Sequence, residues 1–73
     1  MMNSTQTTLF ELIKAKTGVN PQLNSSLEML QLDSLAMAEL TCEIEQTFKI
    51  RVGDDITFVT DMTELLNYIE DRL

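Results

Sequence analysis

The feature that most constrains the fold of this chain is an uninterrupted stretch, SLAMAELTCEIEQTF, at positions 34–48. It contains no glycine and no proline. Its large apolar residues recur every three or four positions, at Met37, Leu40, Ile44 and Phe48. That spacing places them on one face of an α-helix. We therefore expect a long helix whose inner face contributes to a hydrophobic core.

Two further segments, residues 5–17 and about 61–72, show the same helical period. The first ends before Gly18, and the second begins at Thr60 or Asp61, residue types that stop and cap helices respectively. Residues 54–58 form at most one short further helix, and alternation typical of strands is brief. The predicted core combines the inner faces of the three main helices: Leu9, Ile13, Met37, Leu40, Ile44, Phe48, Leu65 and Ile69.

Residues 19–32 connect the first two main helices and contain loop-forming residues such as Asn20-Pro21. Spaced apolar residues predict that this loop is ordered and held to the core: Val19, Leu23, Leu27, Leu30 and Leu32. The expected fold is all-α, a small antiparallel bundle of three main helices plus a short third helix, with a long ordered loop between the first and second helices. We expect one domain over residues 1–73, with residues 1–4 disordered.

The chain is too small and too poor in catalytic groups for an autonomous enzyme. A chain of 73 residues buries only about 60% of the surface that its unfolded form exposes, which leaves little room for a deep cleft. It has no histidine, the commonest general base, and its single cysteine, Cys42, excludes an intrachain disulfide and the usual Cys/His metal site. We expect a binding or carrying protein.

Twelve acidic residues against five basic ones give a net charge of −7. This charge would repel nucleic acid and favours partners with basic patches, although it also serves solubility alone. The first residues, MMNSTQTT, show no signal peptide, and no apolar run reaches the roughly 20 residues of a membrane span. We expect a cytoplasmic monomer.

A weaker apolar row lies roughly opposite the core face of the 34–48 helix: Leu35, Ala38 and Cys42. Polar and acidic residues flank it: Glu39, Glu43, Glu45 and Gln46. An apolar row rimmed by carboxylates indicates a docking surface for a basic, partly apolar partner. The alternative is that Leu35 and Cys42 pack beneath the loop or the short helix.

The pair Asp33-Ser34 stands where this helix begins. Either residue can serve as the N-cap, and capping alone would explain both. A serine oxygen at a helix N-terminus can also bear a phosphate ester, because free backbone N–H groups and the helix dipole stabilise an anion there. Without a histidine to activate Ser34, another protein would have to perform that chemistry.

Leu32-Asp33-Ser34-Leu35 resembles the attachment motif of acyl carrier proteins, in which the serine receives a phosphopantetheine arm. The resemblance continues through LDSLAMAELTCEIEQTFKIRV and VTDMTELLNYI, and so covers nearly the whole chain. It implies an acyl-carrier-protein-like fold with phosphopantetheine on Ser34 and Asp33 as the adjacent motif residue. The arm would carry acyl groups as thioesters, with room for a growing chain between the helices.

The resemblance also implies partners: a phosphopantetheinyl transferase, and acyl-loading, condensing and acyl-transfer enzymes with basic patches. Their contacts would lie at Leu35, Ala38, Glu39, Cys42 and Glu45, which agrees with the outer row of the helix.

Four positions depart from the family pattern. Gln31 stands where glycine is common, Ala36 and Gln46 where acids are frequent, and Lys49 where glycine or an acid often follows the phenylalanine. Glycine adopts backbone angles at the first position that would cost glutamine energy. The reduced acidity favours a specialised fatty-acid or polyketide-type pathway. The alternatives are an aminoacyl or D-alanyl carrier, and an unmodified helical adaptor.

Overall fold

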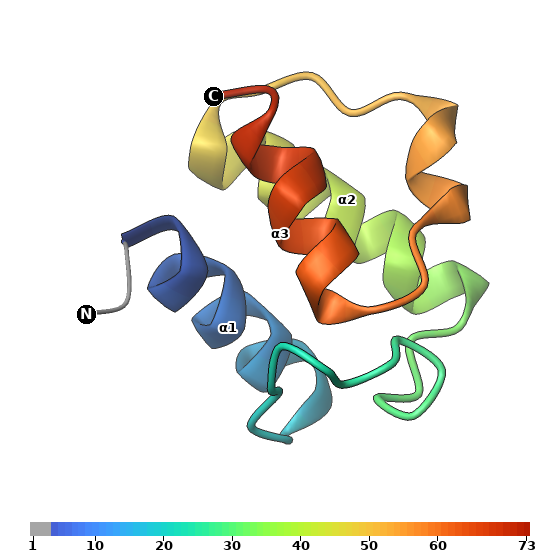
Figure 1. Cartoon of the computed structure of the whole chain (residues 1–73). Coiled ribbons are helices and arrows are strands. Elements are labelled where there is room, and N and C mark those ends of the chain that lie inside the picture. Colours follow the sequence, from blue (N-terminus) through green and yellow to red (C-terminus); the bar gives the residue numbers. More distant parts are fainter. Residues whose placement is uncertain (1–3) are drawn as a thin grey trace.

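The structure is a computed structural model and describes residues 4–73. Its elements are α1 (Ser4–Thr17), α2 (Ser34–Phe48), the 3₁₀ helix η1 (Asp54–Phe58) and α3 (Met62–Glu70) (Figure 1). Helix α1 packs against both α2 and α3. Residues 4–73 form no β-strand, so the all-α prediction is confirmed. In this part of the chain, every helix is too short or too polar to cross a membrane.

The ends of the helices follow from identifiable residues. Helix α1 stops at Gly18, which has a φ of 75° and donates its N–H to the Lys14 carbonyl at 2.7 Å. Helix α3 starts after Asp61, whose carboxylate accepts the Glu64 N–H at 2.8 Å. The disorder expected for residues 1–4 falls mainly on residues 1–3, which lie outside the described residues, and Ser4 is the first residue of α1.

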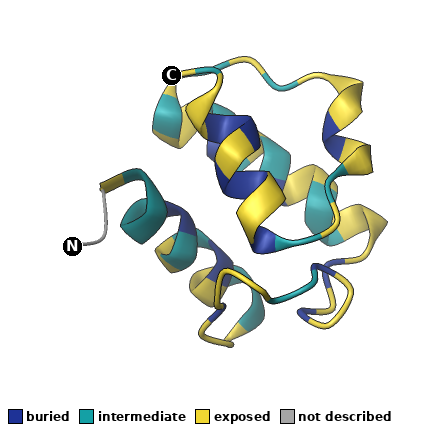
Figure 2. Ribbon diagram, in the orientation of Figure 1, coloured by how far each residue is buried: buried dark blue, intermediate teal, exposed yellow. Residues whose placement is uncertain are grey.

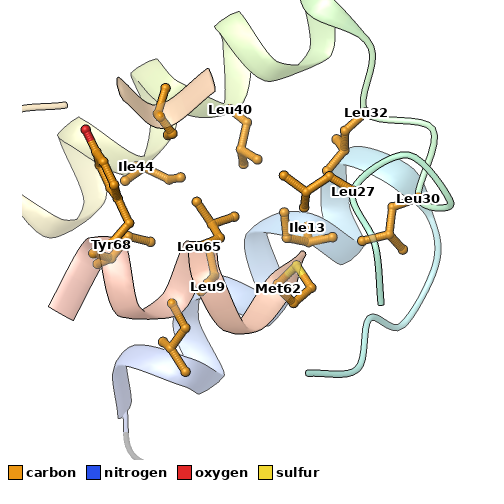
Figure 3. Close-up of a cluster of buried hydrophobic side chains, with 13 residues drawn as sticks. Leu9, Ile13, Leu27, Leu30, Leu32, Leu40, Ile44, Met62, Leu65 and Tyr68 are labelled. Atoms are coloured by element: carbon orange, nitrogen blue, oxygen red, sulfur yellow. The ribbon is translucent and has the colours of Figure 1, made fainter. Parts of the chain in front are cut away.

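The core lies where the three α-helices and the loop before α2 meet (Figures 2 and 3). Leu9, Ile13, Leu40, Ile44, Leu65 and Ile69 are fully buried, as the helical period predicts. Met37 and Phe48 are only partly buried, so their predicted full burial is wrong. They lie on the edge of the buried face of α2, and Met37 also lines an open groove.

The segment between α1 and α2 contacts the start of α3. Leu27 donates its N–H to the Thr60 carbonyl, and Met62 donates its N–H to the Ser25 carbonyl, both at 3.0 Å. Three leucines of this segment are buried, namely Leu27, Leu30 and Leu32, whereas Val19 and Leu23 are 50% and 41% exposed. These contacts fix the chain that leads into α2, and with it the position of Ser34.

Candidate functional site

The start of α2 is fixed by Asp33. Its backbone is extended, and its carboxylate accepts the Ala36 N–H at 2.9 Å, so Asp33 is the N-cap. The Asp33 carbonyl accepts the Met37 N–H at 2.8 Å and begins the helical hydrogen-bond pattern. Ser34 is therefore the first helical residue and is not itself the cap.

The turn before the cap places a non-glycine residue in the left-handed region. Gln31 has a φ of 61°, and its carbonyl accepts the Asp33 N–H at 3.1 Å. Such a conformation costs an L-residue other than glycine roughly 1–2 kcal/mol. Lys49, which follows α2, has a φ of 56°. The resemblance to the carrier family implies that glycine is common at position 31 and glycine or an acid at position 49.

The side chain of Ser34 is exposed, and its hydroxyl has no hydrogen-bond partner within residues 4–73. Asp33 is occupied by the cap, and the chain has no histidine. Nothing in the described part of the chain therefore activates Ser34 as a nucleophile. Its hydroxyl is accessible to an external catalyst, at the helix end where backbone N–H groups favour an anion.

A groove of about 580 Å³ opens beside Ser34. Leu32 and Met37 line its near side, and the apolar side chains of the far side are Val52, Ile56 and Val59. The groove also contains polar groups at its rim, among them Asp33 and Thr57. Its apolar lining and its position beside the serine suit a flexible chain attached to the Ser34 oxygen.

The outer row of α2, Leu35, Ala38 and Cys42, is exposed to solvent. Leu35 is 71% exposed, although leucine is usually buried. The alternative that Leu35 and Cys42 pack beneath the loop or the short helix is therefore wrong. The structure thus leaves an apolar row beside the serine that the domain does not use for its own core.

The acidic side chains of α2 have partners inside the molecule. The Lys16 ammonium of α1 lies 3.1 Å from a carboxylate oxygen of Glu43 and 3.5 Å from one of Glu39. The bond with Glu43, followed by attraction to both carboxylates, raises the pKa of Lys16. Glu39 remains 57% exposed at its side chain, so its carboxylate is also accessible to a partner.

Glu45 borders the outer row next to Ala38, and its carboxylate turns toward the chain that follows α2. It is half-buried, and its carboxylate accepts the Val52 N–H at 2.8 Å. The physical reason is that the chain after α2 returns past this helix and presents a backbone N–H that needs an acceptor. Glu45 therefore holds the far side of the groove.

Comparisons with known proteins agree with this geometry. The sequence model of a family described as "Phosphopantetheine attachment site" matches residues 7–63, which include all of α2 and more than half of the chain. The chain belongs to this family. No curated protein sequence matches it. The fold is similar to the crystal structure of an acyl carrier protein from Thermotoga maritima, with a TM-score of 0.78 and 16% identity over 99% of this chain and 94% of that one.

Membership makes this chain a carrier domain that serves other enzymes and is not itself an enzyme. In the family, phosphopantetheine is bound covalently to a serine. The residues of this carrier fit such a group: Ser34 offers a free, exposed hydroxyl, and the groove beside it accommodates an attached chain. When bound, the group supplies a terminal thiol that holds cargo as a thioester.

Sequence reasoning missed the far side of the groove. The carrier forms it from residues 52–59, and Tyr68 of α3 contacts it through its hydroxyl. These residues carry no periodic pattern that marks a site, and a tyrosine in a helical stripe is normally a core residue with a polar tip. Only the return of the chain past α2 brings them together.

Proposed function

We propose that Ser34 is the phosphopantetheine attachment residue and that this chain is a free-standing acyl carrier protein. The observation that carries the proposal is the free hydroxyl of Ser34, held at the first position of α2 by the Asp33 cap. The adjoining groove supports it, because a carried chain needs an apolar surface beside its point of attachment.

The attachment would be made by a phosphopantetheinyl transferase with coenzyme A as donor. The Ser34 oxygen forms a bond to the phosphorus that bears the pantetheine, and the pyrophosphate P–O bond of coenzyme A breaks. Adenosine 3′,5′-bisphosphate leaves, and the hydroxyl proton passes to a base of the transferase. The N-terminal end of α2 stabilises the resulting phosphodiester anion.

Intact-protein mass after incubation with coenzyme A, Mg²⁺ and a phosphopantetheinyl transferase tests this assignment. The parent should gain one phosphopantetheine, and Ser34→Ala should gain none while keeping its helical circular dichroism spectrum. Ser4→Ala is the matched control, because Ser4 is also an exposed serine at the first position of a helix. It should be modified like the parent. A modified Ser34→Ala protein would contradict the assignment and point to another serine, whereas a parent that gains no mass would favour the unmodified-adaptor alternative.

The lining of the groove favours acyl cargo from a specialised fatty-acid or polyketide-type pathway over an aminoacyl or D-alanyl group. Leu32, Met37 and Ile56 offer an acyl chain an apolar surface, whereas the two carboxylates of the lining, Asp33 and Asp54, belong to exposed residues. Chemical shifts of the loaded carrier distinguish the two. An octanoyl thioester should perturb the methyl signals of these three residues, whereas an alanyl thioester should leave them unchanged. Equal perturbation by both would remove this preference.

The outer row is the proposed contact surface for the transferase and for acyl-loading, condensing and acyl-transfer enzymes. Leu35, Ala38 and Cys42 supply exposed apolar area beside Ser34. Glu39 supplies an accessible carboxylate for a basic patch. Glu45 remains a proposed contact, but a partner would share its carboxylate with the Val52 N–H. Such encounters would take place in the cytoplasm, where we propose that this carrier acts as a monomer.

A further inference from the structure

Residues 52–59 form the far side of the groove, the groove wall. It includes η1 and lies across the groove from Ser34 and Met37. Ile56 is the one buried side chain of this segment, and the other side chains are exposed or half-buried. Packing alone therefore fixes the groove wall weakly, and its position depends on hydrogen bonds to the helices around it.

Tyr68 of α3 makes two of these hydrogen bonds with one hydroxyl. The hydroxyl donates to a carboxylate oxygen of Asp55 at 2.6 Å and accepts the Gly53 N–H at 3.0 Å. The ring of Tyr68 is part of the buried cluster, and its oxygen points away from α3 (Figure 3). A buried ring thus anchors the polar contact, and the hydroxyl reaches the start of η1 from a rigid element.

Arg72, two residues after the end of α3, completes this contact. Its guanidinium lies 3.0 Å from the second carboxylate oxygen of Asp55, donates to the Tyr68 carbonyl at 3.2 Å, and stacks 3.5 Å from the centre of the Tyr68 ring. The Tyr68 hydrogen bond, aided by the charge of Arg72, lowers the pKa of Asp55. Burial and the bond to Asp55 raise the pKa of Tyr68. At neutral pH the donor and the acceptor therefore stay in the forms that this contact requires.

The two ends of the groove wall are held differently. At its start, Glu45 of α2 accepts the Val52 N–H, so α2 and α3 both hold residues 52–55. At its end, the chain is tied to the capping residues of α3, where Glu64 accepts the Thr60 N–H at 3.0 Å. Tyr68 thus joins Gly53 and Asp55, at the start of the wall, to the buried core.

We propose that Tyr68 is a positioning residue for the groove wall and that its hydroxyl determines how closely this carrier encloses the group attached to it. This inference rests on the proposed function, because the groove matters only if cargo is attached at Ser34. The hydroxyl itself adds no apolar contact to the core. Its removal therefore tests the hydrogen bonds to the groove wall while the packing of the ring stays the same.

The first test uses the unmodified protein and needs no cargo. Tyr68→Phe keeps the ring and removes both hydrogen bonds, so exchange of the Gly53 amide hydrogen, followed by NMR, should become about tenfold faster. Thr63→Val is the matched control: it removes another α3 hydroxyl, which donates to the Leu23 carbonyl at 2.7 Å on the loop side. It should leave Gly53 exchange unchanged. Unchanged exchange in Tyr68→Phe would overturn the positioning role.

A second variant of the same contact sharpens this result. Asp55→Asn removes the ion pair with Arg72 but leaves a carbonyl oxygen for the Tyr68 hydroxyl and leaves the Gly53 bond in place. Its acceleration of Gly53 exchange should therefore be smaller, about twofold to threefold. An acceleration equal to that of Tyr68→Phe would assign the effect to the ion pair and not to the tyrosine hydroxyl.

The second test measures enclosure directly. The modified carrier is loaded with an octanoyl thioester, and cleavage by hydroxylamine is followed by intact mass. Tyr68→Phe should raise this rate at least threefold over the parent and over Thr63→Val. An acetyl thioester, whose single methyl group offers the groove little apolar surface, should be cleaved equally fast in all three. Equal octanoyl rates would overturn the link between Tyr68 and cargo. Faster cleavage of both thioesters would indicate instead that the substitution loosens the whole domain.

Failure of Ser34 to accept phosphopantetheine would refute the proposed function, while Gly53 exchange would still decide the role of Tyr68.

Discussion

The two faces of α2 carry leucines in opposite environments. Leu40 points into the core and is completely buried (Figure 3), whereas Leu35 begins the outer row and is 71% exposed. Burying a leucine side chain contributes about 1.5–3 kcal/mol, so Leu40 is explained by the fold alone. Leu35 gains nothing comparable in the isolated domain. The difference teaches that the helical spacing of apolar residues identifies the core. Apolar residues of the same helix that the core does not bury are then the candidates for a binding function.

Truncation of the two leucines gives the largest contrast. Leu40→Ala should lower the free energy of unfolding by about 2–5 kcal/mol, because it removes buried methyl groups and leaves a cavity. Leu35→Ala should change it by less than about 0.5 kcal/mol, since the side chain is already in water. Urea denaturation followed by circular dichroism measures both. Equal losses would mean that the outer row belongs to the core and that the docking surface lies elsewhere.

Most of this contrast was predictable from the sequence. The bounds of α2 follow from an uninterrupted helical segment with Asp33 before it, and the period separates Leu40 and Ile44 from Leu35. Met37 and Phe48 were predicted to be fully buried but are only partly buried. The helical period alone gives the direction in which a side chain leaves the helix. How deeply that side chain is buried depends on which other segments of the chain pack against it.

The direction of Glu45 was not predictable, because it depends on a segment with no periodic pattern. At 100° per residue, Glu45 lies between the outer row and the inner face, and only the return of the chain at Val52 decides where its carboxylate goes. The same return creates the groove wall and brings Asp55 to Tyr68. Long-range placement of irregular backbone is thus the part of the site that local sequence does not encode.

Removal of the Glu45 carboxylate therefore tests whether this side chain stabilises the fold or only borders the exposed face of α2. Glu45→Ala should lower the free energy of unfolding by about 1–2 kcal/mol, since a half-buried Val52 N–H loses a charged acceptor. Gln46→Ala, at the neighbouring exposed position, is the control and should change it by less than about 0.5 kcal/mol. The same denaturation measurement applies. If Glu45→Ala matches Gln46→Ala, then the carboxylate belongs to the outer row, as the sequence first indicated.

The contrast between the faces also requires that α2 begin where it does, because a shift by one residue would rotate each face by 100°. The turn at Gln31 leads into the Asp33 cap with a φ of 61°. Gln31→Gly should relieve that strain and raise the free energy of unfolding by about 0.5–1 kcal/mol. Gln22→Gly, at an exposed loop position without positive φ, should lower it by about 0.5 kcal/mol through the greater freedom of the unfolded chain. A loss of stability in both variants would contradict the strained turn.

The smallest effect concerns the charge beside the outer row. Glu39 is exposed but already paired with Lys16, so its attraction for a basic partner is partly offset. Glu39→Gln should slow modification by the transferase about twofold at low salt, and the difference should vanish near 1 M salt, where the Debye length falls to about 3 Å. Lys16→Gln should act in the opposite direction, because it frees Glu39 and Glu43 together.

Glu11→Gln, which neutralises an exposed acid on α1, is the control for net charge. Equal slowing by Glu11→Gln and Glu39→Gln would show that the transferase responds to the overall charge and not to this face of α2. Slowing by Glu39→Gln but not by Glu11→Gln would show that the transferase responds to the carboxylate beside the outer row, where Leu35 offers exposed apolar area.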